Sequence, residues 1–134
     1  MVPEAPDYIV IKIKEEDKLL SNVWQRSVTS EEYRAGLSLV KQYLLQHDIH
    51  LWLADSRKLA NVTFEDQQWL IKKLVPELLT SKLQKIARVM HADVFTYISF
   101  EQQMERAYQN HPILAETAQF TSVEAALSWL YLKG

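Results

Sequence analysis

The chain of 134 residues predicts an α/β domain that opens with an antiparallel hairpin and continues as alternating helices and strands. Two observations lead to this class. Near the N-terminus, two short runs with strand-like patterns are joined by a brief charged turn, which is typical of a hairpin. Beyond them, helix-capping signals alternate with apolar runs. Such alternation implies right-handed crossovers and a mixed, mostly parallel sheet.

The hairpin is predicted from residues 8–14 and 19–27. In Tyr8–Lys14, isoleucine occupies every second position, so one face of the strand is apolar. In Leu19–Ser27, Leu20 and Trp24 share a face. The short charged connection between the two runs favours antiparallel pairing.

The first helix is predicted to begin after Thr29, because Thr29 and Glu32 have the spacing of a capping box. Gly36 lies inside this helix, where glycine costs about 1 kcal/mol relative to alanine. We interpret Gly36 as a point of close packing on the sheet. The residues of the expected core face recur at helical spacing and are Tyr33, Leu37, Val40 and Leu44.

The centre of the chain predicts a buried strand followed by a second helix. Ile49–Ala54 is nearly all apolar, which suits a strand covered on both faces. Thr63, with Asp66 three residues later, marks the start of a helix over Phe64–Leu79. Pro76 lies within that helix and should kink or shorten it, since proline lacks a backbone donor.

The C-terminal part predicts one strand–helix pair followed by another. These elements are Leu83–Ala92, residues 93–110, Ile113–Phe120 and Val123–Leu132. Thr121 and Glu124 have the spacing of a capping box for the final helix. The chain is therefore expected to carry about four helices in one domain.

Composition excludes several kinds of protein. The formal net charge of −2 offers no broad attraction to nucleic acid. Without cysteine there are no disulfides, thiolate metal sites or cysteine nucleophiles. The only glycines are Gly36 and Gly134, too few for a Walker loop or a dinucleotide-binding fingerprint. No apolar stretch approaches the roughly 20 residues of a membrane span. The N-terminus also lacks the pattern of a signal peptide, so we expect a cytoplasmic protein.

Residues that could perform catalysis have ordinary explanations. The four histidines lack metal-binding spacing. Glu31 and Glu32, and likewise Glu65 and Asp66, fall in first helical turns, where acidic residues complement the helix dipole. There is no Gly-x-Ser-x-Gly nucleophile motif. We therefore expect a protein that is not an enzyme and that has no metal and no cofactor.

The candidate functional residues follow the third strand, because ligands and partners of α/β proteins dock where strands end and helices begin. They are Asp55, Ser56, Arg57, Thr63, Phe64 and Trp69. Two interpretations remain open for the turn after the third strand, for Thr63 and for Trp69. Asp55 and Arg57 either anchor a turn or form a polar site. Thr63 is a helix cap or a phosphorylated hydroxyl, and Trp69 belongs to the core or to a partner surface.

Four segments carry a resemblance to a known family. They are Val28–Leu37, Leu51–Leu70, Ala92–Phe95 and Ser122–Leu130, which read VTSEEYRAGL, LWLADSRKLANVTFEDQQWL, ADVF and SVEAALSWL. Together with the element order, they resemble the SpoIIAA-like superfamily, and most of all small bacterial STAS/SEC14 domain proteins. The resemblance implies a five-stranded sheet with helices mainly on one side. It also implies phosphorylation near the helix after the third strand, for which Thr63 and Ser56 are the available hydroxyls.

The sequence and the resemblance together lead to a functional hypothesis. We expect a non-enzymatic binding or regulatory module that docks a protein partner, or a second copy of itself, through the edge from Asp55 to Trp69. The alternative is a carrier of a small apolar or lipid-like ligand between sheet and helices, as in Sec14-type relatives.

Overall fold

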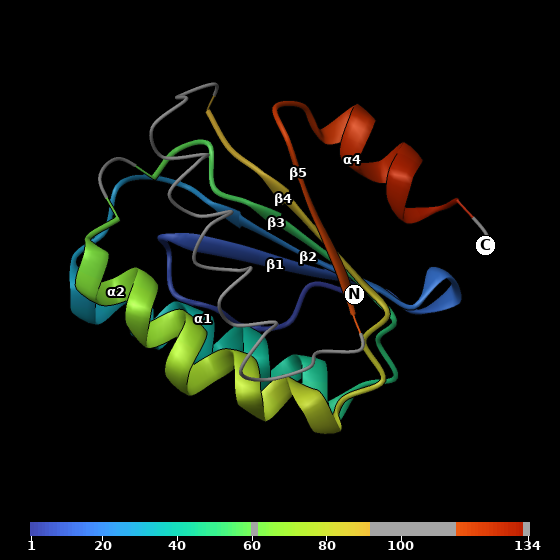
Figure 1. Ribbon diagram of the computed structural model, residues 1–134, viewed down its shortest axis with the longest axis horizontal. Coiled ribbons are helices and arrows are strands. Elements are labelled where there is room, and N and C mark those ends of the chain that lie inside the picture. Colours follow the sequence, from blue (N-terminus) through green and yellow to red (C-terminus); the bar gives the residue numbers. More distant parts are fainter. Residues whose placement is uncertain (60–61, 92–114, 133–134) are drawn as a thin grey trace.

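The computed structural model describes residues 1–59, 62–91 and 115–132. Its centre is a five-stranded sheet with the strand order β1-β2-β3-β4-β5 (Figure 1). Strands β1 and β2 are antiparallel, and each later neighbour is parallel. The strand bounds are β1 Ile9–Lys14, β2 Leu19–Trp24, β3 Leu51–Asp55, β4 Lys85–Val89 and β5 Glu116–Phe120. The predicted α/β class, with a mixed sheet opened by a hairpin, is confirmed.

The helices lie on both faces of the sheet. Helix α1 (Ser30–Gln46) and helix α2 (Phe64–Trp69) lie side by side on one face, and α4 (Val123–Leu130) covers the other (Figure 1). The described residues thus hold three α-helices, not about four. The helix predicted over residues 93–110 lies outside the described ranges. Two of the three described helices share one face, which agrees with the expectation that the helices pack mainly on one side.

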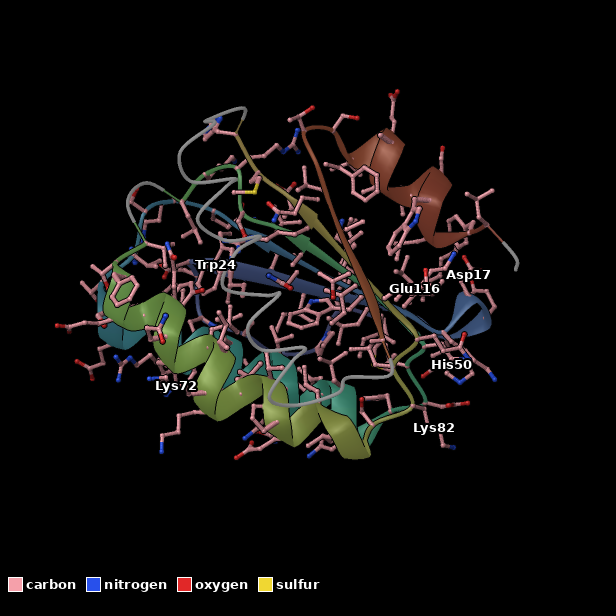
Figure 2. All side chains as sticks on the ribbon, viewed as in Figure 1. Asp17, Trp24, His50, Lys72, Lys82 and Glu116 are labelled. Atoms are coloured by element: carbon pink, nitrogen blue, oxygen red, sulfur yellow. The ribbon has the colours of Figure 1, made fainter. Side chains whose placement is uncertain are left out.

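The two faces bury separate apolar clusters. The larger one joins β1 and β2 to α1 and to the segment after α2, and the smaller one packs α4 on β3 and β4. In the larger cluster, Trp24 is stacked between Tyr8 and Tyr33, with ring centroids 6.1 and 5.6 Å away. Figure 2 shows Trp24 between the sheet and the helices below it.

Gly36 allows α1 to approach this stack. A Cβ atom placed on Gly36 would lie 2.6 Å from Cη2 of Trp24, which is too short for carbon atoms in contact. Trp24 is almost completely buried and cannot move aside without disturbing both tyrosines. The close packing expected at Gly36 is therefore present, and its partner is Trp24.

Helix α1 begins with the predicted capping box. The Thr29 hydroxyl accepts from the Glu32 amide at 3.1 Å, and the Glu32 carboxylate accepts from the Thr29 amide at 3.0 Å. Arg26 donates to the same carboxylate, and its hydrogen bond and that of Thr29 lower the pKa of Glu32 to about 2. The start of α1 is thus fixed by contacts within seven residues of sequence.

The segment predicted as one helix over Phe64–Leu79 changes its winding twice. Helix α2 ends at Trp69, and a π-helical turn (Leu70–Leu74) and a 3-10 segment (Val75–Thr80) follow it. The Val75 amide donates to the Leu70 carbonyl, five residues earlier. Proline cannot donate to the carbonyl four residues before it and clashes with that group. The irregular winding is the physical result expected next to Pro76.

The cap of α4 differs from the prediction. Ser122, not Thr121, is the N-cap, and its hydroxyl accepts from the Ala125 amide at 3.2 Å. Strand β5 extends to Phe120, whose carbonyl accepts from the Met90 amide, so Thr121 belongs to the link and the helix begins later.

Throughout the described ranges, no helix is long and apolar enough to cross a membrane.

We predict that Gly36→Ala destabilises the protein although alanine favours helices. The clash with Trp24 should cost about 1–3 kcal/mol, more than the roughly 1 kcal/mol gained in helix propensity. Urea unfolding measures the change. Ser38→Ala is the control, because Ser38 is exposed on the same helix and its substitution brings only the propensity gain. A Gly36→Ala variant as stable as the wild type would contradict the packing argument.

Candidate functional site

Asp55, Ser56 and Arg57 form a turn at the carboxyl end of β3. Asp55 is buried, and its two carboxylate oxygens accept from Nε and Nη2 of Arg57 at 3.0 and 2.8 Å. The Arg57 amide also donates to Asp55, at 3.1 Å. The Ser56 amide donates to the Val89 carbonyl and ties the turn to β4. The carboxylate is thus engaged in holding its own turn.

Thr63, Phe64 and Trp69 belong to the start and end of α2. The Thr63 hydroxyl caps the helix by accepting from the Asp66 amide at 3.1 Å. Phe64 is 66% exposed. Trp69 is half-buried against the larger core, and the Arg34 guanidinium lies over its ring, 5.5 Å from the centroid. Phosphorylation of Thr63 or Ser56 stays a prediction, because no contact in the structure tests it.

Asp66 joins α2 to α1. Its Oδ1 atom accepts from the Ser30 hydroxyl at 2.5 Å and from Nε of Arg34 at 2.9 Å. Burial on its own raises the pKa of Asp66, but the hydrogen bonds from Ser30 and Arg34 outweigh it, so the net pKa is lowered. The buried carboxylate of Asp66 is bonded to two side chains of α1. These contacts fix the position of the first turn of α2, which carries Phe64.

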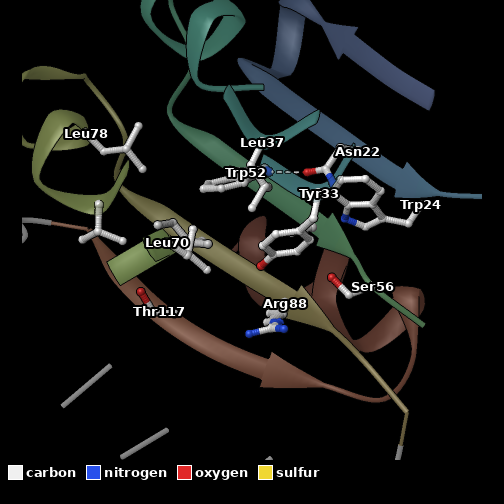
Figure 3. A pocket seen from close by; sticks show the side chains of 13 residues that line it. Asn22, Trp24, Tyr33, Leu37, Trp52, Ser56, Leu70, Leu78, Arg88 and Thr117 are labelled. Atoms are coloured by element: carbon white, nitrogen blue, oxygen red, sulfur yellow. Dashed lines mark hydrogen bonds between the residues drawn. The ribbon is translucent and has the colours of Figure 1, made fainter. Parts of the chain in front are cut away.

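A cavity of about 60 Å³ lies between the sheet and the helical face that carries α1 and α2 (Figure 3). Most of its wall is apolar. The polar side chains that line it are Asn22, Tyr33, Ser56, Arg88 and Thr117. Among the candidate residues, only Ser56 reaches this cavity, so the edge after β3 and the cavity are largely separate features.

A wider and more open hollow, of about 770 Å³, lies at the opposite end of the sheet. Asp17, His50, Lys82 and Glu116 are among the residues that line it, and they lie at the same end of the sheet in Figure 2. Its charged groups are of both signs, and several pair with one another or with groups at its rim. Lys82 lies 3.7 Å from Asp48, and Asp17 accepts from the Tyr131 hydroxyl at 2.9 Å. This mixed and paired surface favours no ligand class.

Within the described ranges, no three His, Asp or Glu side chains are close enough together to hold a metal ion. His50 instead lies 3.1 Å from the Asp48 carboxylate in an exposed pair.

Asn22, Arg88 and Asp66 were not among the candidate functional residues predicted from the sequence. Two of them carried a readable signal. Arg88 is the one charged residue between apolar neighbours in the core of β4, and Asn22 occupies the core-facing position between Leu20 and Trp24. A polar residue at a position that the strand pattern reserves for the core points to a buried polar site. Asp66 gave no such signal, because a first-turn acid already has an explanation.

We predict that Asp66→Asn lowers the free energy of unfolding by about 2 kcal/mol at neutral pH, because Arg34 and Ser30 lose a charged acceptor. The folded pKa lies below the unfolded one, so the carboxylate stabilises the fold above the unfolded pKa. That contribution is lost as the pH falls through the folded pKa. Urea unfolding at several pH values should show the difference shrinking in acid.

The exposed neighbour Glu65 provides the control for this measurement. Glu65→Gln should leave stability nearly unchanged at every pH. A difference between wild type and Asp66→Asn that stays constant from neutral to strongly acidic pH would show that the charge of Asp66 is unimportant.

Comparison with known proteins supports the fold alone. No family model matches the chain, and no curated protein matches it. A similar solved structure is that of an uncharacterized protein from the DUF3478 family with a SpoIIAA-like fold, from Shewanella loihica PV-4. The two chains are 18% identical, the alignment covers 96% of this chain and 98% of the other, and the TM-score is 0.56. The chain described here has the SpoIIAA-like fold.

Proposed function

We propose that the chain is a non-enzymatic binding module of the bacterial, cytoplasmic STAS/SEC14 type that docks a protein partner through the start of α2. The observation that carries this proposal is the exposure of Phe64. A phenylalanine that leaves two thirds of its surface in water gains free energy when a partner covers it.

The support beneath Phe64 makes this surface suitable for docking. Thr63 caps the helix directly before it, and Asp66 ties the same turn to Ser30 and Arg34 on α1. Binding to a surface that is already ordered costs less conformational entropy. Arg34 and Trp69 lie beside each other on the same pair of helices, and both residue types are frequent in binding hot spots.

The size of the cavity favours docking over the lipid-carrier alternative. A pocket for a drug-sized or lipid-like ligand needs roughly 300 Å³ or more, whereas the cavity beside the sheet measures about 60 Å³. The exposed aromatic surface therefore favours docking of a protein partner, and the small interior cavity argues against a lipid carrier.

We predict that Phe64→Glu weakens partner binding and leaves the fold intact. An acidic residue is favourable in a first helical turn, so the helix should still form. The loss should be on the order of thirtyfold in affinity, as for a central aromatic hot spot. Affinity capture from extracts of the source cells would identify the partner, and titration calorimetry with the purified partner would measure its affinity.

Val2→Glu is a matched control, because Val2 is also 66% exposed but lies at the chain terminus. It should bind the partner like the wild type. Sedimentation of the purified chain distinguishes a second copy from a different protein, since a dimer that Phe64→Glu dissociates identifies the partner as the chain itself. Equal binding by wild type and Phe64→Glu would exclude this surface.

A further inference from the structure

Two polar side chains flank a small residue in the row of the sheet that lies beneath the cavity. Asn22 of β2 pairs in register with Ala54 of β3, and Ala54 pairs with Arg88 of β4. Residues paired across parallel strands point to the same face, and neighbouring strands are about 4.8 Å apart. Ala54 carries only a methyl group, so the space above it stays open between the longer side chains of Asn22 and Arg88.

The orientation of the Asn22 amide is determined by Trp52. The indole Nε1 of Trp52 donates to Oδ1 of Asn22 at 2.7 Å (Figure 3). An indole nitrogen is only a donor, so the oxygen of the amide must face it and the NH2 group must point elsewhere. Asn22 is fully buried, and its Nδ2 atom has no acceptor among the residues that the structure describes. A buried donor without an acceptor is unfavourable, and a ligand oxygen would satisfy it.

The other polar groups of the cavity also favour an electron-rich ligand. Arg88 is only 8% exposed and keeps its positive charge as a guanidinium. Figure 3 shows the hydroxyl end of Tyr33 pointing toward Arg88, with Ser56 at the same end of the cavity. The described residues that line the cavity include no Asp or Glu. The side chains facing the cavity thus present a cation and several possible donors.

The remaining wall and the volume limit the size of the ligand. Trp24, Leu37, Leu70, Leu78 and Ile86 supply apolar surface. A water molecule needs roughly 10–15 Å³ of such volume, so a cavity of about 60 Å³ holds a molecule of only a few heavy atoms. We propose that this cavity binds a small carboxylate with a short apolar body, with the carboxylate between Asn22 and Arg88 and the apolar part against the helices.

This site is separate from the docking surface proposed above, since Phe64 does not line the cavity. Failure of one proposal leaves the other standing.

The first test compares propionate, propionamide and octanoate on the full chain. The indole N–H signal of Trp52 reports on the cavity directly, because its acceptor is Asn22. Propionate should shift this signal in a saturable manner. The uncharged propionamide should not, because it lacks the anionic group, and octanoate should not, because its chain is too long for the cavity.

The second test replaces Asn22 by aspartate. Asn22→Asp keeps an oxygen for the Trp52 N–H but exchanges the NH2 donor for an anionic oxygen. Propionate affinity should fall about tenfold or more. Gln42→Glu makes the same chemical change at an exposed position of α1 and should bind like the wild type. Near-UV circular dichroism shows whether the aromatic core of each variant is intact.

Four results would overturn the proposal: no saturable change with propionate, equal binding of propionamide, tighter binding of octanoate, or unchanged affinity in a folded Asn22→Asp variant. If Asn22→Asp does not fold, the comparison of propionate with propionamide on the wild type decides the question alone.

Discussion

The packing of Trp24 against Gly36 is the constraint on which one face of the structure depends. Trp24 ends β2 and is stacked between Tyr8 before β1 and Tyr33 on α1, so one side chain joins the hairpin to the first helix. Only a residue without a side chain fits where α1 crosses the indole. The distance between α1 and the sheet is therefore set at this point. That distance also decides how far Tyr33 reaches across the sheet toward Arg88.

The polar row of Asn22 and Arg88 lies within this apolar face and is difficult to explain by stability. A buried charge loses its hydration, and apolar residues of similar size often serve stability equally well or better. The neighbours in the same strands, such as Leu20 and Ile86, show that apolar residues fit here. Ala54 between the two polar residues also leaves a gap that a larger side chain would fill. The buried Nδ2 donor of Asn22, which has no acceptor among the described residues, is better explained by a bound ligand than by folding.

The local parts of the fold could be predicted from the sequence, and the long-range parts could not. The hairpin and the Thr29 cap depend on residues close in the chain, and they were predicted correctly. The cap of α4 was placed one residue too early, because the extent of β5 depends on its pairing with β4. The ion pair of Asp66 with Arg34 spans 32 residues and depends on how two helices pack. No pattern in the sequence encodes that geometry, whereas two polar residues of the cavity, Asn22 and Arg88, interrupt the apolar pattern of their strands.

The two proposed sites meet in one segment of the chain. Phe64 faces solvent at the start of α2, while Leu70, Val75 and Leu78 in the irregular turns that follow line the cavity. A π-helical turn interrupts the regular hydrogen-bond pattern, and such turns are frequent at functional sites. Pro76 removes one further donor from this stretch. The part of the helical layer that covers the cavity is therefore its least regular part, whereas the turn that carries Phe64 is capped by Thr63 and tied to α1 by Asp66. This contrast places capped, regular backbone under the exposed surface and irregular backbone over the buried site.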